Sequence, residues 1–400
     1  MSAHQKPTII WLHSHFLYWM GGTKFVYEVI KNLKEDYKIR VIVENSTEES
    51  INKYKDIGVD IISLNKLTST SPLYWITLPI QIIIDYIKIK NILRSQEYEI
   101  IVSSMFPMNI FPYLLHKKHV QYCFEPFAFF HDPEFVKNFP LIKRSLIRLT
   151  SFFYKWIDVF ATKQANAIIT LNNTTSKFIT EIYKVGAKIS YAGIDTKHFC
   201  PFVSKKLIKK YKDMDIIVHS TDYTPVKGTE SMIRIFAEVK KKSPNAHLLI
   251  TSTINNVQEK NRLERITSEL GINNNVKFLG FVDYDILPQI YSIAKVLVQC
   301  SFSERSGTTS MALPVKEAMA CGTLCVRYPV KNEDVQDGVT GFLVDPRDTR
   351  KMVNRVVRIL GMRPKEYQNA ARMARLSIVN KYNWIYTSSV VKRTINSIIH

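Results

Sequence analysis

Short apolar runs alternate with helix-length segments along most of the chain. Strands separated in this way by helices are typical of parallel sheets that are covered by helices. A first series of runs, expected as buried strands, covers residues 7–12, 37–43, 59–64, 99–103, 120–124 and 167–171. A second series covers residues 215–219, 247–251, 276–279, 296–299 and 323–328. The sequence therefore predicts an α/β protein of two doubly wound halves, joined near residues 193–207.

Helices are expected between these strands and at the end of the chain. The clearest apolar periodicity lies at residues 79–94, 174–183, 230–241, 257–270 and 286–293. The tail, residues 364–400, is expected to be helical with a break near residues 380–384.

The composition is that of a folded globular protein. The chain has 400 residues, of which 46% are hydrophobic and 22% charged, a size that suggests two or three domains. Its five cysteines are odd in number and lack metal-binding spacing. We therefore expect buried free thiols in a reducing compartment and no metal site.

Two segments in the first quarter of the chain are candidates for targeting or membrane segments, and neither fits that role. Residues 1–6 are polar and lack the basic-then-apolar layout of a secretion signal. The longest apolar run, residues 75–93, is interrupted by Pro79 and by three charged side chains. Charges are costly at bilayer depth, so a core helix is expected there rather than a membrane span.

Residues 137–163 combine basic, aromatic and aliphatic side chains. Two interpretations are open: a helix in a membrane interface, with its cations on lipid phosphates, or a core-packing helix with a solvated basic face. The coincidence of basic charge with Trp and Phe favours membrane contact. The formal net charge of +20 also implies an anionic partner. Nucleic acid is not expected, because the chain shows no nucleic-acid-binding signature.

The stretch from residue 301 to residue 346 has the pattern of an anion-binding helix start. Hydroxyl residues, including Thr309, precede Pro314, and proline is favoured in a first helical turn. A helix over residues 315–321 is expected to end at Gly322. The free N–H groups and positive dipole end of such a helix suit a phosphate. Glu317, a carboxylate on its first turns, is better suited to accept hydrogen bonds from sugar hydroxyls.

In the first half, a glycine pair follows the first strand. Gly21 and Gly22 precede Thr23, where an amphipathic helix is expected to open. A strand, a glycine-bearing turn and a helix form a unit of the dinucleotide-binding type. Since two glycines alone are a weak signal, a simple tight turn stays an open alternative.

Several motifs of the second half occur together. They are Gly193-Ile-Asp with Phe199, Lys227-Gly228, Val276-Lys-Phe-Leu-Gly with Tyr291, Glu317-Ala-Met-Ala-Cys-Gly, and residues 337–346, which read DGVTGFLVDP. Together they resemble the motifs of retaining GT-B glycosyltransferases of family 4. The resemblance is nearly continuous over the second half, whereas in the first half it rests on Gly21-Gly22 and residues 167–176.

The resemblance implies two Rossmann-like domains that face a cleft. An acceptor domain would span residues 1–193 and include the basic segment 137–163. A nucleotide-sugar domain would span residues 194–378, and a C-terminal helix, residues 379–400, would cross back onto the first domain. The resemblance also implies retaining transfer of a sugar from a nucleotide diphosphate, without a metal or another cofactor.

The same resemblance assigns residues to the donor. Without a metal, the diphosphate leaving group needs another positive charge, and Lys227 would supply it. Glu317 would accept hydrogen bonds from the ribose hydroxyls. Main-chain groups at Gly21, Gly22, Leu313 and Val315 would complete the phosphate site. Main-chain groups at Phe281 and Val282 would contact the base.

The second half departs from the family pattern at two points. The family's first glutamate, which lies near the transferred sugar, is replaced here by Thr309, with Glu304 as a nearby acid. The family's loop arginine is absent as well, because residues 221–222 are Thr and Asp. Thr309 can bond a sugar hydroxyl but carries no charge, and Lys227 is left as the cation of its loop.

The first half lacks the histidine that many relatives place near the donor sugar, since Phe124 occupies that position. Glu125 and His131 are the polar candidates nearby, with a surface-loop role as the alternative for His131. His13 and His15 lie at the end of the first strand, where open α/β sheets place ligands.

The reading favoured is an enzyme, a hexosyltransferase peripheral to the cytoplasmic face of the cell membrane. Its partners would be a nucleotide-sugar donor, a glycan, lipid-linked saccharide or glycolipid acceptor, and an anionic membrane surface. Two alternatives stay open. One is a catalytically impaired GT-B protein that binds a glycan or a partner, against which the retained Glu317 and Lys227 argue. The other is a sugar-nucleotide epimerase, which would act on the donor alone.

Overall fold

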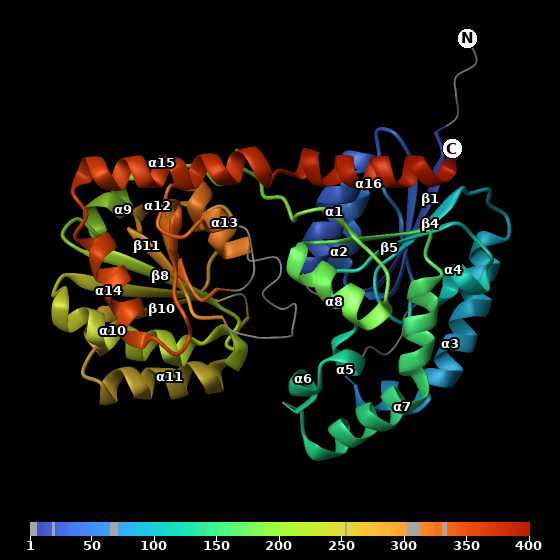
Figure 1. The fold of residues 1–400 in the computed structure, drawn as a ribbon, viewed down its shortest axis with the longest axis horizontal. Helices are drawn as coiled ribbons and strands as arrows, with labels where there is room; N and C mark the ends of the chain where they lie inside the picture. Colours follow the sequence, from blue (N-terminus) through green and yellow to red (C-terminus); the bar gives the residue numbers. More distant parts are fainter. Residues whose placement is uncertain are drawn as a thin grey trace, which may run out of the picture. The chain divides into compact units, whose positions relative to one another are not determined.

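The computed structural model describes residues 6–17, 21–64, 71–137, 139–252, 254–301, 313–329 and 334–400. These residues form two α/β units (Figure 1). The first unit contains the described residues up to Gly193 and those from Trp384 onward, and the second contains those from Ile194 to Asn383. Each unit has one parallel sheet covered by helices, which confirms the predicted fold class of two doubly wound Rossmann-like domains.

The first unit is built on a sheet of seven parallel strands in the order β3-β2-β1-β4-β5-β6-β7. The order reverses between β1 and β4, so the carboxyl ends of these two neighbours form the switch point of the sheet. The strands are β1 (Thr8–Phe16), β2 (Lys38–Ser46), β3 (Ile61–Ser63), β4 (Ile100–Ser103), β5 (His119–Tyr122), β6 (Ala167–Thr170) and β7 (Lys188–Ile189).

Helices cover both faces of this sheet. The first helix, α1 (Gly21–Leu33), starts at the glycine pair itself and buries Phe25, Val26 and Val29. This start is earlier than the expected opening at Thr23. The other helices of the unit are α2 (Glu48–Asp56), α3 (Pro72–Leu93), α4 (Ile110–Leu114), α5 (Ala128–His131), α6 (Pro133–Lys137), α7 (Leu141–Lys163), α8 (Asn173–Tyr183) and α16 (Trp384–Ile399).

The start expected for α3, at Pro79, was wrong. The helix begins seven residues earlier, at Pro72, and continues through Pro79. Proline has no N–H, so Pro79 cannot donate to the carbonyl of Trp75 one turn earlier. The hydroxyl of Thr150, on α7, points to that carbonyl oxygen at 3.5 Å. The same hydroxyl lies 2.8 Å from the carbonyl oxygen of Leu146 in its own helix, so its single proton goes mainly to Leu146 and the contact with Trp75 is weak.

The last helix of the chain completes the first unit. α16 packs against α1, and the Trp384 ring lies 5.5 Å from the Phe25 ring. The Ser190 hydroxyl donates to the carbonyl of Thr387 at 3.0 Å. The break before α16 falls at Tyr382 and Asn383, within the range expected from the sequence.

The second unit has six parallel strands in the order β10-β9-β8-β11-β12-β13, with its switch point between β8 and β11. Its strands are β8 (Asp215–Thr221), β9 (Ala246–Ser252), β10 (Val276–Phe281), β11 (Val296–Gln299), β12 (Leu324–Arg327) and β13 (Gly341–Leu343). Its helices are α9 (Lys205–Lys210), α10 (Thr229–Lys242), α11 (Val257–Glu269), α12 (Leu287–Ile293), α13 (Leu313–Ala320), α14 (Thr349–Leu360) and α15 (Pro364–Lys381).

Two features of the described residues bear on partners. None of their helices has the length and apolar character needed to span a bilayer. All five cysteines are free thiols, and four of them are buried.

Candidate functional site

Two loops meet at the switch point of the second sheet. One follows β8 and carries Asp222 and Lys227, and the other begins after β11 with Cys300 and Ser301. Because the two strands are neighbours, their carboxyl ends lie side by side. Ligands of open α/β sheets bind in this position. The residues expected to contact the diphosphate, Lys227 and the start of α13, therefore follow the two strands that border one crevice.

Gly228 fixes how these two loops approach each other. Its φ is +66°, and a Cβ built on it would lie 2.3 Å from the carbonyl oxygen of Cys300. No side chain fits at that distance, and L-residues rarely adopt this backbone conformation. The glycine of the Lys227-Gly228 motif is thus required for the β8 loop to pack on the end of β11.

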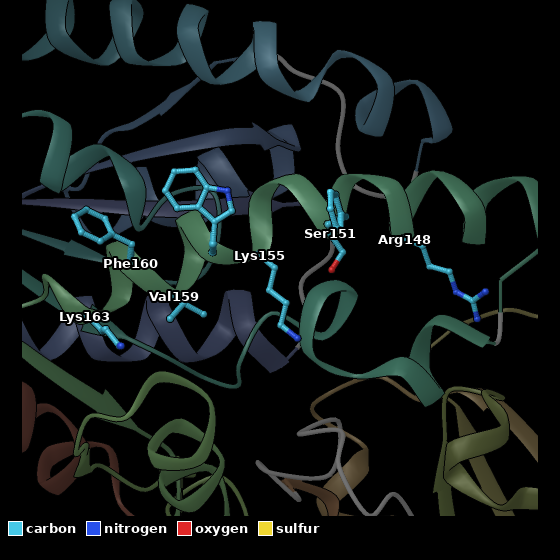
Figure 2. Close-up of a pocket in the computed structure, with 8 residues that line it drawn as sticks. Arg148, Ser151, Lys155, Val159, Phe160 and Lys163 are labelled. Carbon is cyan, nitrogen blue, oxygen red and sulfur yellow. The ribbon is translucent and has the colours of Figure 1, made fainter.

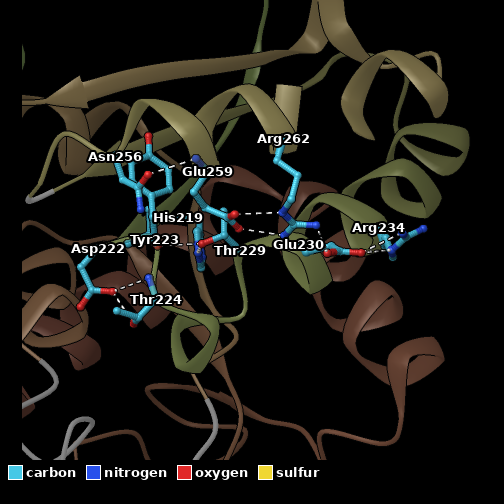
Figure 3. Close-up of polar contacts among 11 residues, drawn as sticks. His219, Asp222, Tyr223, Thr224, Thr229, Glu230, Arg234, Asn256, Glu259 and Arg262 are labelled. Atoms are coloured by element: carbon cyan, nitrogen blue, oxygen red, sulfur yellow. Dashed lines mark hydrogen bonds and ion pairs between the residues drawn. The ribbon is translucent and has the colours of Figure 1, made fainter. Parts of the chain in front are cut away.

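Lys227 has a carboxylate partner in its own loop. The lysine ends a short 3₁₀ turn, η1 (Pro225–Lys227), and its Nζ lies 3.7 Å from Asp222 Oδ2. Asp222 also accepts hydrogen bonds from the backbone N–H of Thr224 at 2.9 Å and from its hydroxyl at 2.5 Å (Figure 3). Both charged side chains are partly exposed, and such long, solvated ion pairs are weak. An incoming anion can therefore compete for the ammonium.

A buried histidine anchors the base of this loop. His219, in β8, lies with Nδ1 2.9 Å from the carbonyl oxygen of Val298 and with Nε2 3.2 Å from the Thr229 hydroxyl (Figure 3). Burial lowers the pKa of His219 to about 4. The neutral ring thus donates from Nδ1 and accepts at Nε2. The hydroxyls of Thr229 and Thr221 are 2.7 Å apart, which ties the start of α10 to the end of β8.

Sequence reasoning missed His219 because nothing in a buried strand distinguishes a structural histidine from its apolar neighbours. The network it forms brackets Lys227, since Thr221 and Thr229 lie on either side of the loop that carries the lysine. The loop is thereby held at both ends.

Glu317 lies on α13 and is buried, with 8% of the residue exposed. The Tyr291 hydroxyl, from α12, points to Glu317 Oε2 at 3.5 Å. Burial first, and then the charge of Glu317, hold the pKa of Tyr291 well above its usual value. Tyr291 therefore stays a hydrogen-bond donor to the carboxylate. The tyrosine was noted in the sequence only as part of a motif, and the structure shows which side chain it contacts.

The other residues expected at the donor lie at strand or helix ends. Leu313 and Val315 form the first turn of α13, and Val315 is fully buried, so its main chain is what a ligand could reach. Phe281, 71% exposed, ends β10, which is the edge strand two places from β8. Val282 follows it directly. Thr309, like Glu304, lies outside the described residues.

At the first unit's switch point, the backbone leaves room beside the expected ligand position. Nothing lies within 4 Å of a Cβ built on Gly22, which with Gly21 begins α1 just after β1. His13 and His15 lie on one face of β1, where the His13 ring stacks on Phe16 at 4.9 Å. Burial, with a smaller effect of His15, lowers the pKa of His13 to about 3. The His13 ring is therefore neutral at physiological pH.

His131 is held in a polar cluster inside the first unit. Its Nε2 lies 2.7 Å from Asp158 Oδ2, and both side chains are almost fully buried. The same aspartate accepts hydrogen bonds from Asn109 at 2.8 Å and from the Tyr183 hydroxyl at 2.9 Å. These contacts account for His131 structurally, and its catalytic role stays a prediction. Glu125 is half-buried in the segment after β5.

The comparisons with known proteins address this site. Residues 203–376 match the family model of glycosyl transferases group 1. The match supports a group 1 glycosyltransferase. It covers the whole sheet of the second unit, from β8 to β13, with Lys227 and Glu317.

Two curated relatives align with this chain over part of their length. One is an uncharacterized glycosyltransferase of Methanocaldococcus jannaschii, 27% identical over 60% of this chain and 61% of the relative. The other is an Escherichia coli UDP-Gal:alpha-D-GlcNAc-diphosphoundecaprenol alpha-1,3-galactosyltransferase, 24% identical over 64% of this chain and 65% of the relative. The chain thus spans less than two thirds of the length of either.

A solved structure matches nearly the whole chain. Anabaena HepE, in complex with UDP and glucose, superposes with a TM-score of 0.73 over 98% of this chain and 100% of HepE, at 16% identity. At this identity the likeness establishes the shared fold of two Rossmann-like domains.

Proposed function

We propose that the protein transfers a hexosyl group from a nucleotide-diphosphate sugar to a glycan or lipid-linked acceptor. The observation that carries the proposal is the location of Lys227 and Glu317, which follow the two strands at the switch point of the second sheet. This sheet lies in the part of the chain that matches glycosyl transferases group 1. A diphosphate in this crevice would meet the ammonium of Lys227 and the N–H groups at the start of α13. Glu317, held by Tyr291, would accept hydrogen bonds from the ribose hydroxyls.

We propose further that the transfer is retaining and independent of a metal. Charge builds up on the diphosphate as the glycosidic bond breaks, and a preorganised cation stabilises it. Lys227 is suited to this task because its ion pair with Asp222 is long and solvated. Main-chain groups at Phe281 and Val282 and the side chain of Thr309 are the further donor contacts proposed beside Lys227 and Glu317.

Two relatives support the proposed substrates. The Escherichia coli protein is named for a UDP-sugar donor and a diphosphoundecaprenol-linked acceptor, and HepE was solved with UDP and glucose. In line with the acceptor named for the Escherichia coli protein, we propose that the reaction takes place at the cytoplasmic face of the cell membrane, on a membrane-associated acceptor.

The test starts with a panel of nucleotide-sugars in the presence of EDTA. A thermal shift identifies the donor, because a ligand of the folded state raises its apparent stability. Lys227→Ala should lower kcat/KM by about 100-fold, the loss typical of one transition-state donor. Lys209→Ala, an exposed lysine of α9, is the matched control and should leave kcat/KM unchanged.

The product settles the stereochemistry. Nuclear magnetic resonance of the new glycosidic bond should show the anomeric configuration of the donor. Donor binding without transfer to any acceptor of the panel would contradict the proposal and favour a binding protein. A new nucleotide-sugar formed without acceptor would contradict it in favour of an epimerase.

A further inference from the structure

α3 and α7 each expose an apolar row instead of burying it. On α3 the row repeats every three or four residues, as one face of a helix does, with Leu73, Ile76, Ile80, Ile83, Ile84 and Ile87 each at least 42% exposed. On α7 the exposed side chains are Leu141, Ile142, Leu149, Phe152, Phe153, Trp156 and Phe160. Thirteen of the 27 large hydrophobic side chains exposed in the described residues thus lie on these two helices.

The two helices belong to one surface of the first unit. They pack against each other (Figure 1), and the contact buries Trp75 and Leu78 of α3 with Ile147 of α7. Each helix therefore has one face in the core and an apolar row left over. The sequence interpretation of α3 as a core helix holds for only one of its faces. A contiguous exposed apolar patch marks a site of contact with a protein or a membrane.

The charges on this surface have one sign. The only acidic residue of α3 is Asp85 and the only one of α7 is Asp158, and both are 1% exposed. The exposed charged residues of the two helices are all basic: Lys88, Lys90, Arg148, Lys155 and Lys163. An apolar face with cations and without exposed acids complements an anionic partner.

A groove along α7 combines both kinds of side chain. It has a volume of about 770 Å³ and is lined by three cations, Arg148, Lys155 and Lys163, and by three aromatic rings, Phe152, Trp156 and Phe160 (Figure 2). The cations recur every seven or eight residues and the rings every four, so the two rows run beside each other along the helix. Aromatic rings at the acyl boundary with cations at the phosphates are the pattern of an interfacial helix.

We propose that the face formed by α3 and α7 docks on an anionic lipid bilayer, with the isoleucine row of α3 in the acyl boundary and the cations of α7 on lipid phosphates. A second copy of this chain is a poor occupant, because it would oppose cation to cation. The proposal rests on the proposed function for its purpose, which is to bring a lipid-linked acceptor to the protein. Docking itself is measured without any sugar donor.

The experiment is co-sedimentation of the full chain with vesicles of phosphatidylcholine, with and without 30% phosphatidylglycerol. We expect binding to the anionic vesicles only, and its loss at high salt. The triple variant Arg148→Glu, Lys155→Glu, Lys163→Glu should reduce binding at least tenfold, because each basic side chain near an anionic surface contributes about fivefold. The triple variant Lys206→Glu, Lys209→Glu, Lys210→Glu on α9 carries the same charge change and should bind like the parent.

A second variant tests the apolar row separately from charge. Ile76→Ser, Ile80→Ser, Ile83→Ser should reduce vesicle binding at least tenfold, whereas Met373→Ser, Leu376→Ser, exposed on α15, should not. Equal binding of neutral and anionic vesicles, or unchanged binding of the α3 and α7 variants, would overturn the proposal. So would a concentration-dependent dimer, seen by light scattering, that both variants abolish.

Calorimetry with a nucleoside diphosphate separates this proposal from the proposed function. Variants that lose vesicle binding should keep the parent's affinity for the nucleotide, because none of the substituted residues is among those assigned to the donor. Vesicle binding by a chain that binds no nucleotide would leave docking standing and contradict the proposed function instead.

Discussion

Asp222 Oδ2 lies 3.7 Å from Lys227 Nζ, so the cation expected to meet a diphosphate already faces a carboxylate. Thr221 and this aspartate occupy the region where the resembled family usually has an arginine. The aspartate also closes the loop by accepting the N–H of Thr224. The same side chain thus has a structural role and an electrostatic cost toward an anionic ligand.

Asp222→Asn should separate these two roles. The amide oxygen of Asn can still accept the N–H of Thr224, so the turn is kept, while the negative charge is removed. We expect the affinity for a nucleoside diphosphate to rise by about threefold to tenfold, since one charge near an anion at partial exposure is worth about 1 kcal/mol. Calorimetry at two salt concentrations measures it. Weaker or unchanged binding would show that the carboxylate is needed to place Lys227.

Gly228→Ala should destabilise the second unit by about 3 kcal/mol or more. The added Cβ would lie 2.3 Å from the Cys300 carbonyl oxygen, in a backbone conformation that already disfavours alanine. Gly271→Ala is the matched control. Its φ is +67°, but nothing lies within 4 Å of the new Cβ, so only strain of about 1 kcal/mol remains. Urea unfolding compares the two, and equal losses would refute the close contact with β11.

Tyr291→Phe should weaken the donor site more than the fold. The hydroxyl that points to Glu317 is removed, and the carboxylate loses a donor that orients it. We expect KM for the nucleotide-sugar to rise about threefold to tenfold, because the 3.5 Å contact is long and a typical hydrogen bond contributes about 1 kcal/mol net. Tyr367→Phe removes a hydroxyl that donates to the Lys295 carbonyl in the same unit and should leave KM unchanged. An equal effect of both variants would point to general loosening.

For the buried ion pair of Arg327 and Asp334, we expect the effects of two substitutions on the free energy of unfolding to be non-additive. Arg327 Nη1 lies 2.8 Å from Asp334 Oδ2, with both side chains no more than 2% exposed. Asp334→Leu alone should cost about 3–5 kcal/mol, because it leaves an uncompensated buried charge. The double variant Arg327→Met, Asp334→Leu should recover most of this loss in urea unfolding. Additive losses would mean that the pair contributes through packing alone.

Lys316 predicts a pH dependence of stability. Burial lowers its pKa to about 8, below the usual value near 10.5, with the ammonium over the Tyr382 ring. The folded state therefore releases this proton earlier than the unfolded state, so the cost of burying the charge is full below pH 8 and disappears as pH rises toward 10.5. Lys316→Met should be more stable than the parent at pH 7 by up to about 3 kcal/mol. The difference should shrink between pH 8 and pH 10, and a constant difference would contradict the assignment.

The alternation of apolar runs predicted the strands of both sheets except the short edge strands β7 and β13, because a strand buried on both faces must be apolar throughout. Residues 296–299, for example, were predicted and observed as one strand, β11. The predicted start of α3 at Pro79 was wrong because proline favours the first position of a helix, whereas this helix starts at Pro72 and continues through Pro79. The exposure of the apolar row on α3 could not be predicted either, because apolar residues in a helix do not indicate which of its faces packs against a neighbour.

The candidate site divides in the same way. Lys227 and Glu317 follow from motifs that lie near strand and helix ends, and these ends are fixed by the chain order. Their contacts with Asp222 and Tyr291 depend on side-chain directions, which a sequence does not encode locally. His131 is the converse case, since its nearest carboxylate, Asp158, lies 27 residues away in the sequence.

The last helix of the first unit, α16, follows the second unit in the sequence and is therefore translated after it. On a ribosome, residues 1–193 emerge long before Trp384 can cover Phe25, so the first unit waits with an apolar face open while the second unit is made. A chain that ends just before Trp384 therefore lacks part of its first unit, although all of the truncated residues come after the second unit.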